Sequence, residues 1–131
     1  MSTSPAIVLV VDDDETLLSF LGRGLARYGY RAELARSGRE ALRLLAEQPI
    51  AVALTDVMMP EMDGIELLRA IRARQPDLPV VAMTGADHAM HGPLALLLHA
   101  LGAHAVLSKP FALDTLIATL RHALARVSHT P

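Results

Sequence analysis

Five side chains suited to phosphoryl chemistry fall where short apolar runs of the sequence end. They are two adjacent aspartates, a third aspartate, a threonine and a lysine: Asp12, Asp13, Asp56, Thr84 and Lys109. If the runs are parallel strands, their last residues gather at one edge of the sheet, where open α/β sheets build their sites. We therefore expect an acidic, cation-dependent site assembled from residues nearly a hundred positions apart.

Three carboxylates held close together repel one another, and protonation or a bound cation must relieve that repulsion. Mg²⁺ prefers oxygen ligands and needs only a few carboxylates, so two aspartates suffice and the third can act as a nucleophile. An aspartate can accept a phosphoryl group when a metal and a lysine balance the charge on the transferring oxygens. Lys109 can supply that charge, and the Thr84 hydroxyl can donate to the bound phosphoryl group.

Composition narrows the class of protein. The chain has 131 residues, 52% of them hydrophobic, a net charge of −2 and no cysteine. This length suits one domain with a single core, and no apolar run approaches the ~20 residues of a membrane span. Residues 1–5 also lack the pattern of a secretory signal, so we predict a soluble, cytoplasmic protein without membrane contact. The lack of cysteine excludes disulfides, and the charge argues against direct nucleic-acid binding.

The elements that must position these residues alternate between strand and helix. Short runs of Val, Ile and Leu predict strands at 6–11, 31–35, 51–55, 79–83 and 104–108, with a helical pattern in each interval. Apolar stripes mark three helices: Leu17, Leu21 and Leu25; Ile65, Leu68 and Ile71; and Leu113, Leu116, Ile117, Leu120 and Leu124. Strands that are apolar throughout indicate helices on both faces. We predict an α/β fold with one doubly wound sheet of five parallel strands and five helices.

Capping patterns place two helix starts. Ser37 with Glu40, and Asp63 with Glu66, match the reciprocal capping arrangement, which predicts helices from about residues 38 and 64. We therefore assign Asp63 to capping rather than to chemistry.

Four segments of the chain resemble the receiver domain of bacterial two-component response regulators. They are the acidic residues 10–14, the loop 56–64, the strand end 82–85 and the Lys-Pro segment 108–111. The similarity covers essentially the whole length, and four matches in this order are far more specific than any one of them. The resemblance implies a flavodoxin-like (βα)5 fold and a receiver domain over residues 1–131 with no output domain.

The resemblance also implies roles for the acidic residues. Asp56 would take a phosphoryl group from a phosphohistidine of a partner histidine kinase or phosphotransfer protein. Asp13 would bind Mg²⁺ (or Mn²⁺) directly, Asp12 would hold metal-bound water, and Asp56 and the backbone carbonyl of Met58 would complete the ligands. The protein would catalyse only its own phosphotransfer and dephosphorylation, so it is expected to be a switch rather than an enzyme.

Other roles concern the response to phosphorylation. By resemblance, Lys109 would pair with Asp56 and then with the phosphoryl group, Thr84 would be the switch hydroxyl, and the bond before Pro110 would be cis. Members of the family usually carry Tyr or Phe at the position of Val106, where the ring rotates as the threonine moves. Valine has too little bulk for that, so we expect output through backbone shifts in the following loop and helix.

A second departure lies between Thr84 and Gly102, which is longer than in typical receivers by about one helical turn, ~3–4 residues. Residues 86–92 are the expected insertion. Pro93 suits the first turn of the fourth helix, and residues 94–98 make that helix apolar on several faces. We expect this helix to form a homodimer or to bind a downstream protein; the alternative is extra core packing.

The residues also have plainer interpretations. Asp12, Asp13 and Asp14 could only cap the first helix, as we expect of Asp14 itself. Thr84 could be a turn hydroxyl and Lys109 a surface lysine, but their coincidence at one edge favours a site. Gly64 is assigned to backbone freedom.

The histidines are a weaker signal. His88 and His91, three residues apart, could ligate a transition metal, although a polar loop is the preferred interpretation. The other four look scattered along the chain: His99, His104, His122 and His129.

Two other functions stay open. A module that has lost phosphorylation would keep the fold, and Val106 leaves room for it. A phosphohydrolase would need an acid/base carboxylate two residues after Asp56, where the chain has Met58. Because the chain stops soon after its last helix, a stand-alone regulator, as in chemotaxis or a phosphorelay, is expected first and a domain excised from a longer protein second.

Overall fold

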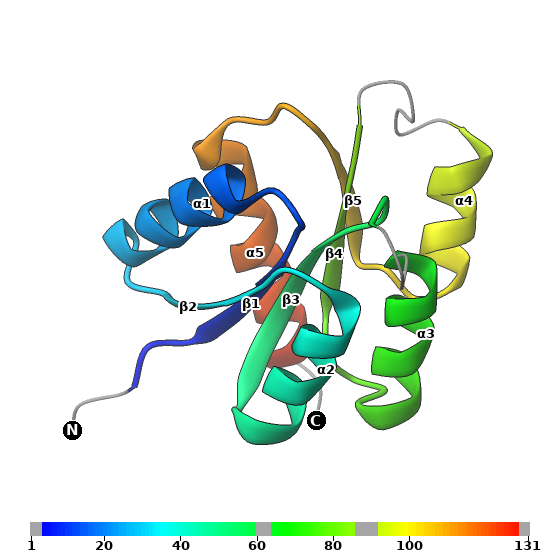
Figure 1. Cartoon of the computed structure of the whole chain (residues 1–131), viewed down its shortest axis with the longest axis horizontal. Helices are drawn as coiled ribbons and strands as arrows, with labels where there is room; N and C mark the ends of the chain where they lie inside the picture. Colours follow the sequence, from blue (N-terminus) through cyan, green and yellow to red (C-terminus); the bar gives the residue numbers. More distant parts are fainter. Residues whose placement is uncertain (1–3, 60–63, 86–91, 129–131) are drawn as a thin grey trace.

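The computed structural model describes residues 4–59, 64–85 and 92–128, which form one parallel sheet between two layers of helices (Figure 1). The strands are β1 (Ile7–Val11), β2 (Arg31–Ala35), β3 (Ile50–Asp56), β4 (Val80–Thr84) and β5 (Ala105–Ser108). The helices are α1 (Glu15–Arg27), α2 (Gly38–Glu47), α3 (Gly64–Arg74), α4 (Pro93–Ala100) and α5 (Leu113–Ser128). Each strand lies within one residue of its predicted range, and the predicted α/β fold is confirmed.

Both faces of the sheet are covered, with α1 and α5 on one side and α2, α3 and α4 on the other (Figure 1). Side chains of β1 alternate between the two layers: Val8 and Val10 pack with α1 and α5, while Leu9 and Val11 pack with α2 and α3. All five residues of β1 are therefore buried, which explains why this strand is apolar throughout.

Helix starts follow the capping chemistry of the sequence. The Asp14 carboxylate accepts hydrogen bonds from the backbone N–H groups of Thr16 and Leu17, and the Ser37 hydroxyl oxygen accepts one from Glu40. Both caps are confirmed, and α2 and α3 begin at the predicted residues. Asp63 lies outside the described residues.

The predicted stripe of α1 is confirmed at two of its three residues, Leu21 and Leu25. Leu18, Leu21 and Leu25 are buried, whereas Leu17 is only partly buried at the edge of the same cluster. A stripe with a spacing of four drifts around a helix of 3.6 residues per turn, which accounts for the difference.

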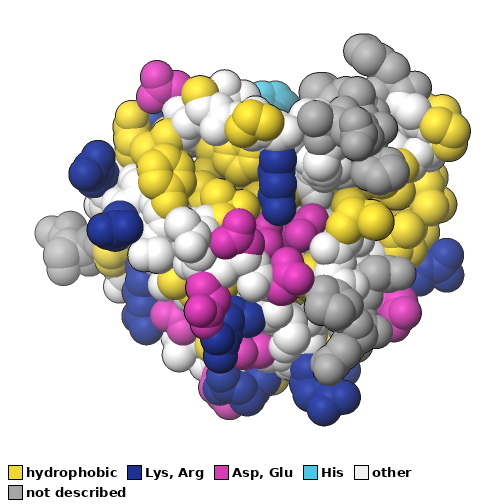
Figure 2. Space-filling view, turned by 45° about the horizontal axis from the view of Figure 1, so that its top comes forward, with side chains coloured by type: hydrophobic (Ala, Val, Ile, Leu, Met, Phe, Trp, Pro, Cys, Tyr) yellow, Lys and Arg dark blue, Asp and Glu magenta, His cyan; other side chains and the backbone are white. Residues whose placement is uncertain are grey.

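Helix α4 begins at Pro93, as predicted, and packs on the sheet through Ala95 and Leu98. Its opposite face exposes Leu96, at 72%, and Leu97, and hydrophobic side chains gather over this helix at the right of Figure 2. Most of the expected insertion, with His88 and His91, falls at residues 86–91, outside the described residues.

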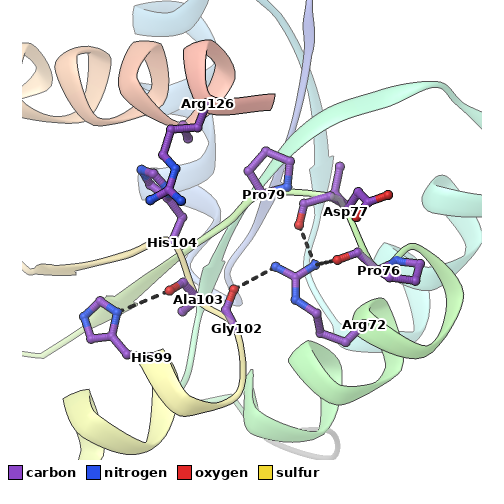
Figure 3. A pocket seen from close by; sticks show the side chains of 11 residues that line it. Arg72, Pro76, Asp77, Pro79, His99, Gly102, Ala103, His104 and Arg126 are labelled. Carbon is purple, nitrogen blue, oxygen red and sulfur yellow. Dashed lines mark hydrogen bonds between the residues drawn. The ribbon is translucent and has the colours of Figure 1, made fainter. Parts of the chain in front are cut away.

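Arg72 ties two loops together at the edge of the sheet where the strands begin (Figure 3). Its guanidinium donates to the carbonyl oxygens of Pro76 and Leu78, before β4, and of Gly102, before β5, the last at 2.8 Å. Gly102 has a φ of +100°, and a Cβ there would lie 2.6 Å from Nε of Arg72. The loops that enter β4 and β5 are thus fixed to α3.

None of the helices in the described ranges is long and apolar enough to cross a membrane.

Candidate functional site

The order of the strands brings the ends of β1 and β3 together. The sheet runs β2-β1-β3-β4-β5, so its order reverses between β1 and β3, where open α/β sheets form a crevice beyond the strand ends. Val11 pairs with Thr55 in the parallel register, and the next residues are Asp12 and Asp56. The register of the backbone therefore sets two carboxylates side by side.

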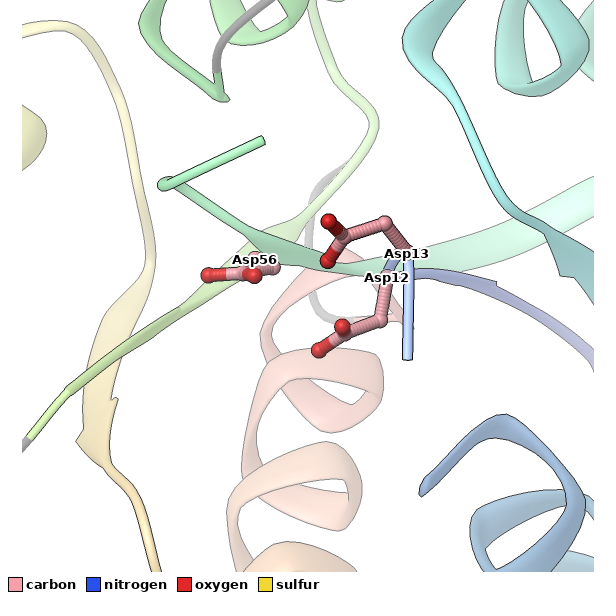
Figure 4. A group of neighbouring side chains, drawn as sticks. All are labelled: Asp12, Asp13 and Asp56. Carbon is pink, nitrogen blue, oxygen red and sulfur yellow. The ribbon is translucent and has the colours of Figure 1, made fainter. Parts of the chain in front are cut away.

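Three carboxylates converge at this point (Figure 4). Oxygen atoms of Asp12, Asp13 and Asp56 all lie within 4.8 Å of one another. Asp12 and Asp56 are buried, 1% and 6% exposed, whereas Asp13 is exposed. Figure 2 shows the same region as a group of acidic side chains in the middle of one face, with a basic side chain beside them.

Lys109 reaches this group from the end of β5. Its ammonium lies 2.6 Å from Oδ2 of Asp12 and 3.4 Å from Oδ2 of Asp56. It is the only lysine of a chain with 12 basic residues, the others being arginines. A single compact ammonium therefore faces two buried carboxylates that would otherwise repel each other. The resemblance implied a pair with Asp56, and the structure adds Asp12 as the nearer partner.

The backbone around Lys109 fixes it to the neighbouring strand. The peptide bond before Pro110 is cis, the isomer that the resemblance implied. The Lys109 N–H donates to the carbonyl oxygen of Thr84 at 2.7 Å, one step beyond the β4–β5 pair of Thr84 and Ser108.

The second oxygen of each buried carboxylate accepts a hydrogen bond from the backbone of the loop that follows it. Oδ1 of Asp12 accepts from the N–H of Asp14 at 2.9 Å, and Oδ1 of Asp56 accepts from the N–H of Met58 at 3.1 Å. Each carboxylate is thus fixed by a backbone amide on one side and faces Lys109 on the other, so both are oriented before any ligand binds.

Burial and charge shift the pKa values of two of these groups. Burial raises the pKa of the Asp56 carboxyl, an effect that the Met58 amide and Lys109 oppose and the charge of Asp12 reinforces. Burial acts to lower the pKa of Lys109, but the hydrogen bond and charge of Asp12, together with Asp56, outweigh it and leave that pKa raised. The lysine therefore stays charged at neutral pH, while Asp56 is a more basic carboxylate than an exposed one.

This set of donors fits a hard divalent cation. Three carboxylates with oxygen atoms in mutual reach match the preference of Mg²⁺ or Mn²⁺ for oxygen ligands, and one lysine does not balance their charge. An acid/base carboxylate for phosphohydrolysis is not found two residues after Asp56, because Met58 occupies that position with its side chain 58% exposed.

Comparison with known families matches residues 8–121 to the response regulator receiver domain. The chain belongs to this family. Receivers of this family are phosphoacceptors, and the two-component function read from the sequence agrees with the match.

Named relatives and solved structures agree with the assignment. The receiver is 44% identical over 125 residues to "Response regulator MprA" of Mycolicibacterium vanbaalenii, an alignment that covers 95% of this chain and 52% of that protein. The chain spans about half the length of the curated relatives it matches.

Two solved structures have the same fold. A response regulator receiver domain protein from Clostridium thermocellum shares 33% identity with a TM-score of 0.85, covering 94% of this chain and 97% of that one. The chemotaxis response regulator CheY4 of Vibrio cholerae shares 32% identity with a TM-score of 0.82, covering 92% and 99%.

The two expected switch positions of the receiver lie on adjacent strands. Thr84 is buried as the last residue of β4, one step beyond the Met83 that pairs with Asp56. Val106 on β5 is 2% exposed and packs in the layer of α2, α3 and α4, which includes Leu98. Val106 therefore lies under α4.

Gly64 has a role that the sequence analysis missed. Its N–H donates to the carbonyl oxygen of Val57, and a Cβ on Gly64 would lie 2.3 Å from Cα of Val57 and 2.7 Å from the carbonyl oxygen of Asp56. The glycine is required by this close approach and not by backbone freedom. In the sequence, only the position of Gly64 at the end of the loop 56–64 hinted at this role.

A further pair on the rim was also missed. Arg36, after β2, forms an ion pair with Glu15 at the start of α1, beside a hollow of about 760 Å³ lined in part by Asp13. Neither residue stands out in the sequence, because their contact depends on how β2 ends next to α1.

Proposed function

We propose that Asp56 accepts a phosphoryl group from the phosphohistidine of a sensor histidine kinase or a phosphotransfer protein. The observation that carries the proposal is the position of the Lys109 ammonium between two buried carboxylates, one of them Asp56, at the switch point of the sheet. An oxygen of Asp56 attacks phosphorus, the P–O bond forms as the P–N bond to the partner's imidazole breaks, and that imidazole keeps the bond electrons and takes up a proton.

The residues around Asp56 have different roles in this transfer. The Met58 amide holds one oxygen of Asp56, and Lys109 balances charge on the transferring oxygens. Asp12, Asp13, Asp56 and the carbonyl oxygen of Met58 would hold Mg²⁺ or Mn²⁺, which when bound neutralises charge on the phosphoryl oxygens. The site accelerates only the phosphorylation and dephosphorylation of its own Asp56.

Labelling with acetyl phosphate and Mg²⁺ tests the proposal. We expect wild type to gain one phosphoryl group per chain by mass spectrometry and Asp56→Asn to gain none. Asp14→Asn is the matched control. Asparagine also caps helices well, the Asp14 carboxylate bonds to backbone N–H groups at the start of α1, and the bond from the Asp14 N–H to Asp12 does not depend on the side chain. No labelling of wild type would indicate a silent module, and turnover of excess acetyl phosphate would indicate a phosphohydrolase.

We propose that phosphorylation changes the surface formed by α4, β5 and α5 and that this surface passes the signal to a partner. Thr84 and Lys109 lie at the ends of β4 and β5, and the backbone bond between them links the phosphoryl site to β5. Val106 has no ring to rotate, so we infer that Thr84 acts on the loop and helix that follow it. The partner is a downstream protein effector rather than nucleic acid, in keeping with a net charge of −2.

Self-association through α4 is a second part of this proposal. Its support is the exposure of Leu96 and Leu97 beside the buried Ala95 and Leu98, which leaves an apolar face on a short helix. Light scattering over a concentration series, with and without phosphorylation, should show dimer in wild type and less in Leu96→Ser. Monomer throughout would count against it.

We also propose that the receiver works in the cytoplasm as a stand-alone protein. CheY4, covered over 99% of its length, is a precedent for a receiver of this size, while the MprA relatives are about twice as long. Immunoblotting of source cells should show a band near 14.1 kDa in the cytoplasmic fraction. A larger band would identify the chain as part of a longer regulator.

A further inference from the structure

Two histidines meet at the opposite edge of the sheet from Asp56. His104 lies just before β5, and its Nε2 is 3.0 Å from Nδ1 of His122 on α5. The ring centroids are 5.0 Å apart and the planes are inclined by 42°. The N–H of His104 donates to the carbonyl oxygen of Val80 at 2.7 Å, so its backbone belongs to the sheet. The ring pair therefore joins α5 to the sheet.

A third histidine makes a different kind of bond beside them. Nδ1 of His99, near the end of α4, is 3.2 Å from the carbonyl oxygen of Ala103 (Figure 3). A carbonyl oxygen only accepts, so Nδ1 of His99 carries the proton, and it does so in both the neutral and the charged ring. This bond survives protonation of His99.

The bond between His104 and His122 responds differently to protons. One of the two nitrogens must accept, so at least one ring must be unprotonated at that atom. One added proton leaves a charge-assisted bond, but a second places two N–H donors face to face between two positive rings. The contact is therefore stable with no or one added proton and unstable with two.

The charged groups around the pair resist that second proton. Arg126 of α5 lines the hollow next to both rings. His99 of α4 and Arg72 of α3 line a second hollow, which His104 and Arg126 also line (Figure 3). Burial, followed by the charges of His122, Arg126 and His99, lowers the pKa of His104. The one carboxylate among the described residues lining these hollows is Asp77, whose charge acts on Arg72.

We propose that His104 and His122 form a pH-sensitive contact between the start of β5 and α5. Their hydrogen bond is formed at neutral pH and breaks when both rings are charged. Acidification then loosens the part of α5 around His122, while His99 of α4 keeps its bond to Ala103. The chemistry at Asp56 stays intact, because His104 lies at the start of β5, whereas Lys109 and the site lie at its other end. A bound transition metal fits less well, because no described residue lining the hollow of both rings is a carboxylate and Arg126 repels cations.

The test follows the histidine ring protons by NMR as a function of pH, in EDTA, for wild type and His122→Gln. We expect His104 to titrate below its ordinary value of 6.5 in wild type and to move toward it in His122→Gln. His99→Gln is the matched control and should leave the coupling of His104 and His122 in place. An unchanged His104 midpoint in His122→Gln would overturn the proposal.

Amide hydrogen exchange gives a second readout. After correction for intrinsic rates, opening of α5 near His122 should increase about fivefold between pH 7.5 and pH 5 in wild type, the loss of one net hydrogen bond. Glutamine can hydrogen-bond but not titrate, so His122→Gln should lack this increase. An equal increase in both proteins, or micromolar Zn²⁺ affinity of the pair at pH 7.5, would overturn the proposal. Labelling of Asp56 in His122→Gln should equal that of wild type, which keeps this test separate from the proposed phosphotransfer.

Discussion

The ammonium of Lys109 lies closer to Oδ2 of Asp12, at 2.6 Å, than to Oδ2 of Asp56, at 3.4 Å. The lysine thus compensates two carboxylates at once and is held mainly by the one that is not the proposed nucleophile. Oδ2 of Asp56 is thus the more loosely paired of the two oxygens, which suits the proposed nucleophile.

Replacing the lysine should affect both rate and stability. Lys109→Met removes the charge near the transferring oxygens, so labelling by acetyl phosphate should slow by about a hundredfold or more. In EDTA, urea unfolding should show a loss of about 1–3 kcal/mol, because two buried carboxylates lose their cation. Lys109→Arg keeps the charge in a larger, planar group and should retain most of the stability but not the rate. A rate for Lys109→Met within about threefold of wild type would contradict the role of this charge.

Asp12 and Asp13 should differ although both are expected to bind metal. Asp13 is exposed and Asp12 is buried, with bonds to Asp14 and Lys109. Asp13→Ala should weaken the rise of the unfolding midpoint with Mg²⁺ while leaving stability in EDTA unchanged or higher. Asp12→Ala should weaken that rise and also cost about 1–3 kcal/mol in EDTA. Equal stability of the two variants in EDTA would show that the bonds of Asp12 do not support the fold.

The raised pKa of Asp56 predicts a pH-dependent cost to the fold. A group whose pKa is higher in the folded than in the unfolded chain, here above 3.8, stabilises the fold at low pH, and that contribution is lost as pH rises through the folded pKa. Asp56→Asn, which has no charge to bury, should therefore be more stable than wild type at pH 7 in EDTA. Urea unfolding at pH 7 and below pH 4 should show the difference shrinking with acidification. A less stable Asp56→Asn at pH 7 would be inconsistent with this sign.

Gly64 offers a steric test with an internal control. Gly64→Ala would press a Cβ against Cα of Val57, and this overpacking should cost about 1–3 kcal/mol despite the better helix propensity of alanine. Gly22 lies within α1, where a Cβ would make ordinary contact with Leu34 at 3.5 Å. Gly22→Ala should therefore stabilise by about 0.5–1 kcal/mol. Thermal unfolding of both variants measures the opposite signs, and stabilisation by both would rule out crowding at Gly64.

The strands and the acidic group could be predicted because they depend on local pattern. Apolar runs locate β1 and β3, and parallel packing alone then brings Asp12 and Asp56 to one edge. The caps at Asp14 and Ser37 depend on neighbours within three residues, so they too can be found in the sequence.

Contacts between distant elements could not be predicted in this way. The preference of Lys109 for Asp12 depends on sub-ångström placement of β1 relative to β5. The bonds of Arg72 to loop carbonyls and the meeting of His104 with His122 depend on how α3 and α5 rest on the sheet. Periodicity shows which face of a helix is buried but not which side chain of another element it meets.

The ties at the C-terminal end of α4 limit how that helix can move. Arg72 holds Gly102, and His99 holds Ala103, so this end is fixed to α3 and to the entry of β5. Among the described residues, the other end begins at Gly92 and Pro93 without a side-chain cap. A tilt of this helix would therefore pivot about its last turn. Over its ~12 Å length a tilt of about 10° would displace the first turn by roughly 2 Å while the last turn barely moves.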